Sequence, residues 1–180
     1  RKGAENLNRF RNENILIQDD SPCFYIYRQI MGDHMQTGIV AGASLEEYDR
    51  DLIKKHELTR PVKEDDRVNH ISALQAQTGP VFLTYKARPE IDRIVAGVTS
   101  GSAVYDFTAA DGIRHTFWVV NDQQTVAEIN ASFQKLDALY VSDGHHRSAA
   151  ASRVCRMHRE ANPDHNGEEE YNYFLSVIFP

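Results

Sequence analysis

The sequence predicts an α+β domain in which helices flank a mixed β-sheet. Short apolar runs typical of strands alternate along the chain with segments of helical periodicity. One pair of these runs is joined by the hairpin signal Asp111-Gly112, so at least part of the sheet is expected to be antiparallel. A chain of 180 residues is long enough for one domain with its own hydrophobic core.

Two strands are expected near the start of the chain. Residues 24–27 and 38–41 are short runs rich in apolar and aromatic residues, which are typical of strands. The segment between them is polar and contains His34, so we expect it to be a connection.

Two helices are expected next. Ser44 is followed three residues later by Glu47, and this capping box predicts a helix that ends near His56. Pro61 is favourable in the first turn of a second helix, which is expected to end at Gly79.

The rest of the chain continues this alternation. The expected elements are, in order, a strand at 81–85, a helix from Pro89, strands at 103–108 and 115–120, a helix capped by Asn121 or Asp122, a strand at 138–141, a helix through about His158, and a strand at 173–179.

We expect residues 1–180 to form a single α/β domain that is a fragment of a longer protein. The sequence begins at Arg1 without a Met and stops on an apolar run at Pro180, whereas natural termini are usually polar and frayed. Residues 1–14 are expected to be a helical tail belonging to a missing N-terminal part.

The composition argues against several classes of protein. Lys and Arg number 20 against 26 Asp and Glu, a net charge of −6, whereas a nucleic-acid binder needs a basic surface. No apolar run approaches the roughly 18 residues of a membrane span. Cys23 and Cys155 form no metal-binding pair, so a cytoplasmic protein with reduced thiols is expected. The oligomeric state stays open.

The most informative segment follows the strand at 138–141 and reads Asp143-Gly144-His145-His146-Arg147. Gly144 permits a tight turn, and the helix that follows offers unpaired N–H groups and the positive end of its dipole. The two histidines and Arg147 add donors at the same place. This combination predicts a phosphate-binding site.

Asp143 is expected at the carboxyl end of the strand, where it could hold Mg²⁺ or accept a proton. In the alternative interpretation, Asp143 only caps the helix and the two histidines are solvated.

A second segment, residues 54–67, is dense in ionisable side chains. We expect Lys55, His56, Glu57 and Arg60 to point into a cleft shared with the Asp143 segment. Glu57 is then a second candidate for the catalytic base, and the other three would contact phosphate.

Four further residues, which could surround these contacts, are Lys63, Glu64, Arg67 and His70. The alternative is that this segment forms two solvated helix ends, in which Lys63, Glu64 and Arg67 pair along one helix. Zinc is not expected, because adjacent histidines diverge on a helix and no His-x-x-x-His pair occurs.

Five motifs stand out along the chain: Gln36-Thr37-Gly38, Lys54-Lys55-His56-Glu57-x-Thr59-Arg60, Lys63-Glu64-x-Asp66-Arg67, Pro80-Val81-Phe82-Leu83 and Asp143-Gly144-His145-His146-Arg147. With these motifs in this order, the sequence resembles domain-of-unknown-function family 1015 (DUF1015) from about Asn14 to Pro180. Members of this family are longer than this chain on both sides and tend to be encoded near enzymes of serine biosynthesis.

The last motif also resembles the strand–Asp-Gly-His-x-Arg–helix element of the ParB/sulfiredoxin-like superfamily, which includes archaeal free serine kinases. That resemblance implies a catalytic Asp143 and a phosphate-binding role for Gly144, His145, His146 and Arg147. His146 stands where the serine kinases have Thr, so the chemistry need not be identical.

Together these observations predict a nucleotide- or phosphate-binding enzyme that transfers a phosphoryl group to a small hydroxyl metabolite, such as serine. ATP or ADP and Mg²⁺ are the cofactors implied. The second hypothesis is a regulatory module that senses a nucleotide without turnover. A third, a ParB-like DNA binder or nuclease, is opposed by the charge of −6.

Overall fold

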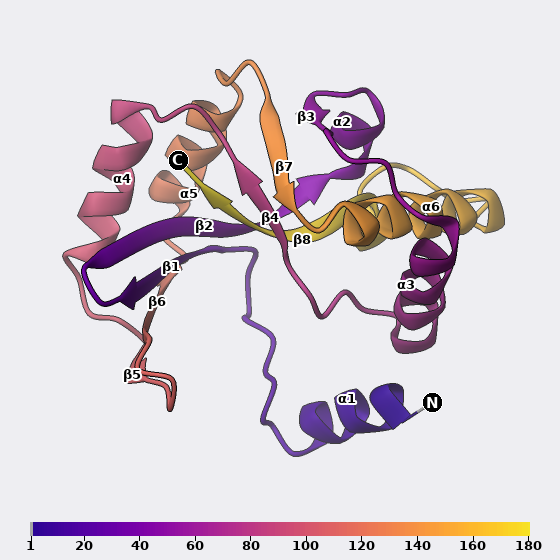
Figure 1. Cartoon of the computed structure of the whole chain (residues 1–180), viewed down its shortest axis with the longest axis horizontal. Helices are drawn as coiled ribbons and strands as arrows, with labels where there is room; N and C mark the ends of the chain where they lie inside the picture. The colour runs from indigo at the N-terminus through magenta and orange to yellow at the C-terminus, as the bar shows by residue number, and fades with distance from the viewer. Residues whose placement is uncertain (1) are drawn as a thin grey trace.

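A computed structural model describes residues 2–180 (Figure 1). Over these residues the chain forms one eight-stranded mixed sheet flanked by helices, which confirms the α+β class. The strands are β1 (Phe24–Met31), β2 (His34–Ser44), β3 (Ile53–Lys54), β4 (Val81–Thr84), β5 (Tyr105–Thr108), β6 (Arg114–Val120), β7 (Leu139–Asp143) and β8 (Tyr173–Phe179). The helices are α1 (Lys2–Asn12), α2 (Leu45–Asp49), α3 (Pro61–Leu74), α4 (Pro89–Thr99), α5 (Gln123–Phe133) and α6 (His145–Ala161), with a 3₁₀ turn at Glu170–Asn172.

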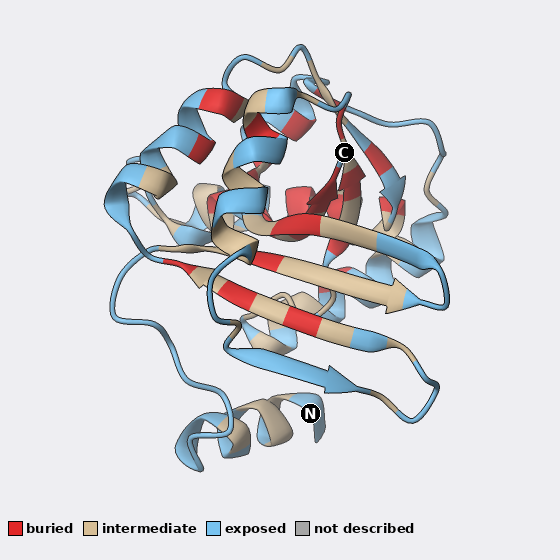
Figure 2. Ribbon diagram, turned by 90° about the vertical axis from the view of Figure 1, so that its left-hand side faces the viewer, coloured by how far each residue is buried: buried red, intermediate tan, exposed pale blue. Residues whose placement is uncertain are grey.

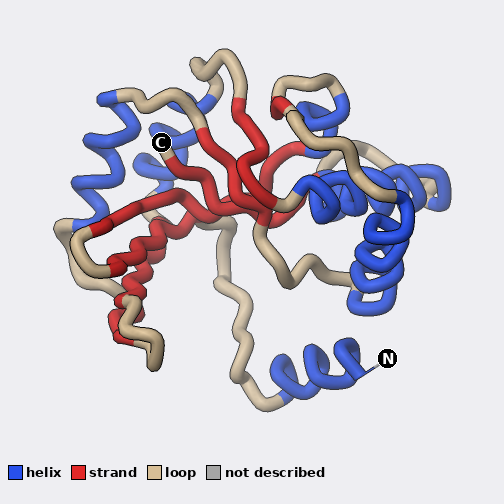
Figure 3. Tube along the Cα trace, viewed as in Figure 1, coloured by secondary structure: helices blue, strands red, loops and turns tan. Residues whose placement is uncertain are grey.

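The strand order is β3-β7-β4-β8-β2-β1-β6-β5. The pairs β3–β7 and β4–β8 are parallel, and the other neighbouring pairs are antiparallel. The expected hairpin around Asp111-Gly112 is confirmed as the β5–β6 pair. The tube in Figure 3 shows α4 and α5 near one end of the sheet and α3 and α6 near the other.

The first two strands are longer than predicted. The polar segment expected to be a connection belongs mostly to β1 and β2, and only Gly32-Asp33 forms the turn. Its polar side chains pair across the ladder, as Gln36 donates to Gln29 over 2.8 Å. Polar residues fit here because cross-strand hydrogen bonds satisfy them.

The helix predicted from Ser44 begins as expected but does not reach His56. The Ser44 hydroxyl accepts a hydrogen bond from the Glu47 amide, so Ser44 caps α2. The helix nevertheless ends at Asp49, and Asp51 adopts a left-handed φ of 59°. Ile53 then pairs with Leu139 in the sheet, and this long-range pairing overrides the local helical pattern.

Most later elements lie where they were predicted. Pro61 opens α3, but the helix ends before Gly79 because Gln75 adopts a left-handed conformation with φ of 50°. Asp122 is the residue that caps α5, since its carboxylate accepts a hydrogen bond from the Thr125 amide.

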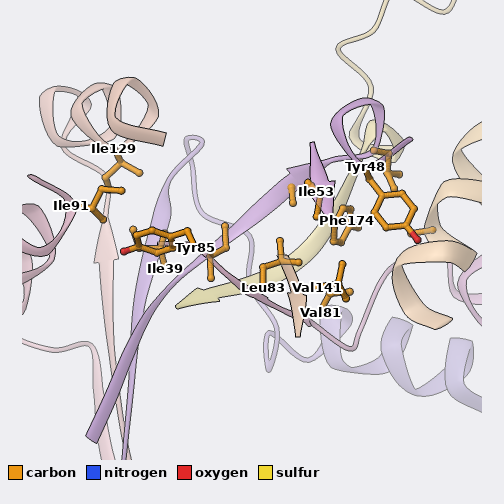
Figure 4. Close-up of a cluster of buried hydrophobic side chains, with 14 of the residues drawn as sticks. Ile39, Tyr48, Ile53, Val81, Leu83, Tyr85, Ile91, Ile129, Val141 and Phe174 are labelled. Carbon is orange, nitrogen blue, oxygen red and sulfur yellow. The ribbon is translucent and has the colours of Figure 1, made fainter. Parts of the chain in front are cut away.

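The hydrophobic core lies between the sheet and the helices (Figure 4). At one end Ile91 of α4 and Ile129 of α5 reach the sheet near Ile39. At the other end the Tyr48 ring packs edge-on against Phe174, with 5.9 Å between ring centroids. Figure 2 shows buried residues both in the central strands and on the helices that cover them, whereas β5 and α1 contain no buried residue.

Two helices, α3 and α6, pack together beside the end of β7 (Figure 1). Arg153 of α6 donates to Glu64 over 2.9 Å and to Asp65 over 2.8 Å, both in the first turns of α3. Because β7 ends at Asp143 and α6 begins at His145, this packing brings the two charged segments of the sequence to one place. Within residues 2–180, no helix has the length and apolarity that crossing a membrane requires.

Candidate anion-binding site

The strand-to-helix junction is built on Gly144. Asp143 is the last residue of β7, and Gly144 is the N-cap of α6 with φ of 100°. L residues rarely adopt this conformation, and a Cβ atom here would lie 3.0 Å from Arg147 Nε. The alternative in which Asp143 caps the helix is therefore wrong.

The junction opens onto a cavity of about 740 Å³. Its walls come from the segment before α3, from the first turns of α3 and from the start of α6. They comprise Glu57, Arg60, Val62, Lys63, Asp66, Arg67, Asp143, Gly144, His145, His146 and Arg147. The structure thus brings two of the four residues predicted for the shared cleft, Glu57 and Arg60, to one cavity with Asp143.

The cavity has a net positive formal charge although the whole chain carries −6. Four of its side chains are Arg or Lys and three are carboxylates. Within residues 2–180, the side chains of Arg60 and Lys63 form no hydrogen bond or ion pair. By contrast, Arg147 donates to Asp143 Oδ2 over 2.5 Å. Two cations therefore face the cavity without a protein partner.

His145 is the buried residue of the junction, with 3% of its side chain exposed. Its Nδ1 lies 3.5 Å from Glu57 Oε2, and the His56 ring meets it edge-on at 4.4 Å. Burial lowers the pKa of His145, the nearby His56 lowers it further, and Glu57 opposes both effects. The other ring nitrogen of His145, Nε2, is buried and has no hydrogen-bond partner among residues 2–180.

His146 connects the two halves of the site. Its Nε2 accepts a hydrogen bond of 3.1 Å from the Arg60 amide. This bond holds the backbone of Arg60 at the start of α6. It leaves the second ring nitrogen, Nδ1, available for another hydrogen bond. Neither interpretation of the two histidines, as phosphate donors or as solvated side chains, included this contact. His146 also positions Arg60.

Two of the predicted ligand contacts lie outside the cavity lining. The Lys55 ammonium donates to the Tyr48 carbonyl over 2.7 Å and lies 4.2 Å from the centroid of the Tyr48 ring. His56 packs against His145 instead of lining the cavity.

The four predicted surrounding residues divide into three groups. Lys63 and Arg67 line the cavity, whereas His70 lines a smaller neighbouring one. Glu64 accepts from Thr59 and from Arg153, so the predicted pairing of Glu64 with Lys63 and Arg67 along the helix is not seen. Its carboxylate is already occupied.

Two residues of the cavity lining, Val62 and Asp66, were not predicted as site residues. Asp66 occurs in one of the sequence motifs and lines the cavity with Lys63 and Arg67. The signal was available, since positions three and four residues beyond Lys63 share its helix face.

The carboxylates suit a cation that arrives with a phosphate. No group of three or more His, Cys, Asp or Glu side chains that could hold a metal occurs within residues 2–180. Mg²⁺, however, is commonly held by one or two carboxylates together with substrate phosphates. Asp143, Glu57 and Asp66 are the carboxylates of the cavity, and Asp143 is the one predicted for Mg²⁺.

The geometry defines an α+β domain in which a strand–turn–helix junction opens onto a cavity lined by four Arg or Lys side chains. The chain belongs to the family described as "Protein of unknown function (DUF1015)", whose model matches residues 1–180. No curated protein and no solved structure matches the chain. The ParB/sulfiredoxin-like core therefore stays a prediction.

Replacing Gly144 by Ala should lower the free energy of unfolding by about 1–3 kcal/mol, because Ala is strained at this φ and its Cβ meets Arg147. Gly97→Ala is the matched control, since Gly97 lies within α4 with open space around it. Gly97→Ala should raise the free energy of unfolding by about 0.5–1 kcal/mol, because Ala is the better helix former. Urea unfolding measures both, and equal effects would contradict the role of Gly144.

His145 should make the stability depend on pH. Its folded-state pKa is lowered, so the unfolded chain binds more protons between the lowered value and the ordinary one of about 6.5. The contribution of His145 to the free energy of unfolding is complete above the ordinary pKa of the unfolded chain. It is lost as the pH falls from there through the lowered pKa of the folded state. Urea unfolding between pH 7.5 and 5 should show a smaller loss for His145→Gln than for the wild type. His34→Gln, at an exposed position, should keep the wild-type dependence, and identical curves for all three proteins would refute the assignment.

Proposed function

We propose that this domain binds a phosphate-bearing ligand, a nucleotide, at the start of α6 and transfers a phosphoryl group to a small hydroxyl metabolite. The observation that carries the proposal is the pair of unpartnered cations, Arg60 and Lys63, in a cavity with a helix N-terminus. The activity also accords with the resemblance of the Asp143 segment to serine kinases.

Phosphate recognition follows from the groups that converge at the junction. The first N–H groups of α6 have no partner within the helix, and the helix dipole favours negative charge there. Arg60 and Lys63 add positive charge from the N-terminal end of α3, which also lines the cavity. Arg147 retains N–H groups beyond the one that donates to Asp143, so it can bind phosphate and Asp143 together.

Phosphoryl transfer needs a base and stabilisation of charge. In the proposed reaction the hydroxyl oxygen attacks the terminal phosphorus, and its proton passes to the Asp143 carboxylate. The bond from phosphorus to the bridging oxygen breaks, and the nucleoside diphosphate leaves with the electron pair. Arg60 and Lys63 stabilise the negative charge that spreads over the phosphoryl oxygens. A bound Mg²⁺ would neutralise phosphate charge at this site.

Glu57 is the second candidate base. Its carboxylate lines the cavity, and a substrate can reach it because 58% of the side chain is exposed. Its carboxylate lies beside His145, which burial keeps in the neutral form near pH 7 by lowering its pKa. A neutral His145 can orient Glu57 by an N–H group without adding a full positive charge to the cavity.

A nucleotide sensor without turnover is the second candidate function. Residues 55–60 contain no helix or strand. Their polar contacts with α6 are the hydrogen bond between Arg60 and His146 and the approach of Glu57 to His145. A ligand at the start of α6 could therefore move this segment as a latch, and such a change needs no chemistry.

Arg60→Ala should weaken nucleotide binding by about tenfold or more, because one charge-assisted hydrogen bond is worth about 1.5–3 kcal/mol. The measurement is calorimetric titration of the chain with ATP and with ADP in the presence of Mg²⁺. Arg93→Ala removes an exposed guanidinium from α4, outside the cavity, and should leave the affinity unchanged. If the wild type binds neither nucleotide at millimolar concentration, the proposed function is wrong.

Asp143→Asn should preserve binding and abolish turnover, since Asn can still accept from Arg147 but takes no proton. A loss of about 10²-fold or more is expected for removal of a general base. Product analysis with ATP and a set of small hydroxyl acceptors measures the rate. Binding with no product from the wild type for any acceptor would favour the sensor.

A further inference from the structure

A smaller cavity of about 150 Å³ adjoins the cavity at the start of α6, which we call the main cavity. Arg67 and Arg147 line both cavities, so their guanidinium groups stand between the two. His70 of α3 and Gly79, in the loop before β4, line only the smaller one, which we call the side chamber.

The two cavities differ in charge. The main cavity combines cations with Glu57, Asp66 and Asp143. The lining of the side chamber includes no carboxylate, and its ionisable groups are Arg67, Arg147 and His70. The other polar side chains there, those of Gln77 and Thr78, are neutral. A ligand group in the side chamber therefore meets positive or neutral side chains and no carboxylate, a setting that favours an anion.

The Arg147 guanidinium is oriented toward both cavities. Its Nη2 donates to Asp143 and would lie 3.1 Å from a Cβ atom on Gly144, so this edge faces the junction. Its Nη1 would lie 3.6 Å from a Cβ atom on Gly79, so this nitrogen faces the wall of the side chamber. Because a guanidinium carries five N–H donors in one plane, Arg147 can contact two anionic groups at once.

His70 lines the side chamber and not the main cavity, and its Nε2 would lie 4.0 Å from a Cβ atom on Gly3 of α1. Within the described residues its ring makes no hydrogen bond or ion pair, and it is exposed. Arg67 has Asp66 as its nearest acidic neighbour, but their separation of 3.8 Å exceeds a hydrogen bond. Both side chains thus have donors to offer a ligand.

We propose that the ligand of this site carries two anionic groups, with a phosphate at the start of α6 and a second anion in the side chamber. This inference rests on the proposed function, which supplies the phosphate. The second anion is a carboxylate or another phosphate, since both accept hydrogen bonds from guanidinium and imidazole. The ligand is accordingly a diphosphate compound, as the nucleotide is, or a phosphocarboxylate, which is the product of phosphoryl transfer to a hydroxy acid.

The test compares three probes by calorimetric titration of the whole chain: inorganic phosphate, pyrophosphate and phosphonoacetate. At least one of the two-anion probes should bind about tenfold or more tightly than phosphate, as expected for one further charge-assisted hydrogen bond. Tighter binding of pyrophosphate indicates a second phosphate in the side chamber, and tighter binding of phosphonoacetate indicates a carboxylate.

The discriminating variant is His70→Ala, which keeps a good helix former within α3. It should remove most of the added affinity for the two-anion probe and change phosphate binding by less than about twofold. His70→Lys restores a donor and should recover the added affinity. His34→Ala, at an exposed position on the first hairpin, is the matched control and should change neither.

The possible failures are distinguishable. If phosphate binds but neither two-anion probe binds more tightly, or if His70→Ala weakens phosphate and the two-anion probe equally, the side chamber takes no anion and the proposed function stands. If neither phosphate nor nucleotide binds, both proposals are wrong.

Discussion

Glu64 accepts a hydrogen bond from the Thr59 hydroxyl on one carboxylate oxygen and from Arg153 on the other. The first contact holds the chain that enters α3, and the second holds α3 against α6. The hydrogen bond from Thr59 lowers the pKa of Glu64, so the carboxylate is ionised near neutral pH. Together with the packing of Val68 against Ala150 and Val154, these contacts place α3 beside the start of α6, where Arg60, Lys63 and Arg67 line the cavity. Glu64 therefore supports the site without lining it.

The buried histidine and the left-handed glycine act on the same small region. Gly144 lets β7 turn directly into α6, which places Asp143 and the first amides of the helix together. His145, the first residue of α6, is buried at this turn. Burial lowers its pKa and so keeps it uncharged near neutral pH. The positive charge of the cavity consequently comes from the Arg and Lys side chains, which a ligand can reach, and not from the buried ring.

The sequence predicted what depends on neighbouring residues and missed what depends on distant ones. The turn at Gly144 and the caps of α2 and α5 were identified because glycine and short polar side chains act locally. The strand β3 was missed because its two residues form a strand only by pairing with β7. Lys55 was expected in the cavity, but the Tyr48 ring and carbonyl hold its ammonium elsewhere. The side chains of the charged segment could not be assigned from spacing alone, since Glu57, Arg60 and Glu64 have partners on α6.

The contacts that close the site join distant parts of the chain, as Arg60 and His146 are 86 residues apart and Glu64 and Arg153 are 89 apart. No short stretch of sequence can form this cavity by itself, because its walls come from residues 57–67 and from residues 143–147. A ligand bound there favours the folded chain over the unfolded one by mass action, by about 2.7 kcal/mol when its concentration is 100 times Kd. Occupancy of the site is thereby linked to the lifetime of the protein under heat, denaturant or proteolysis.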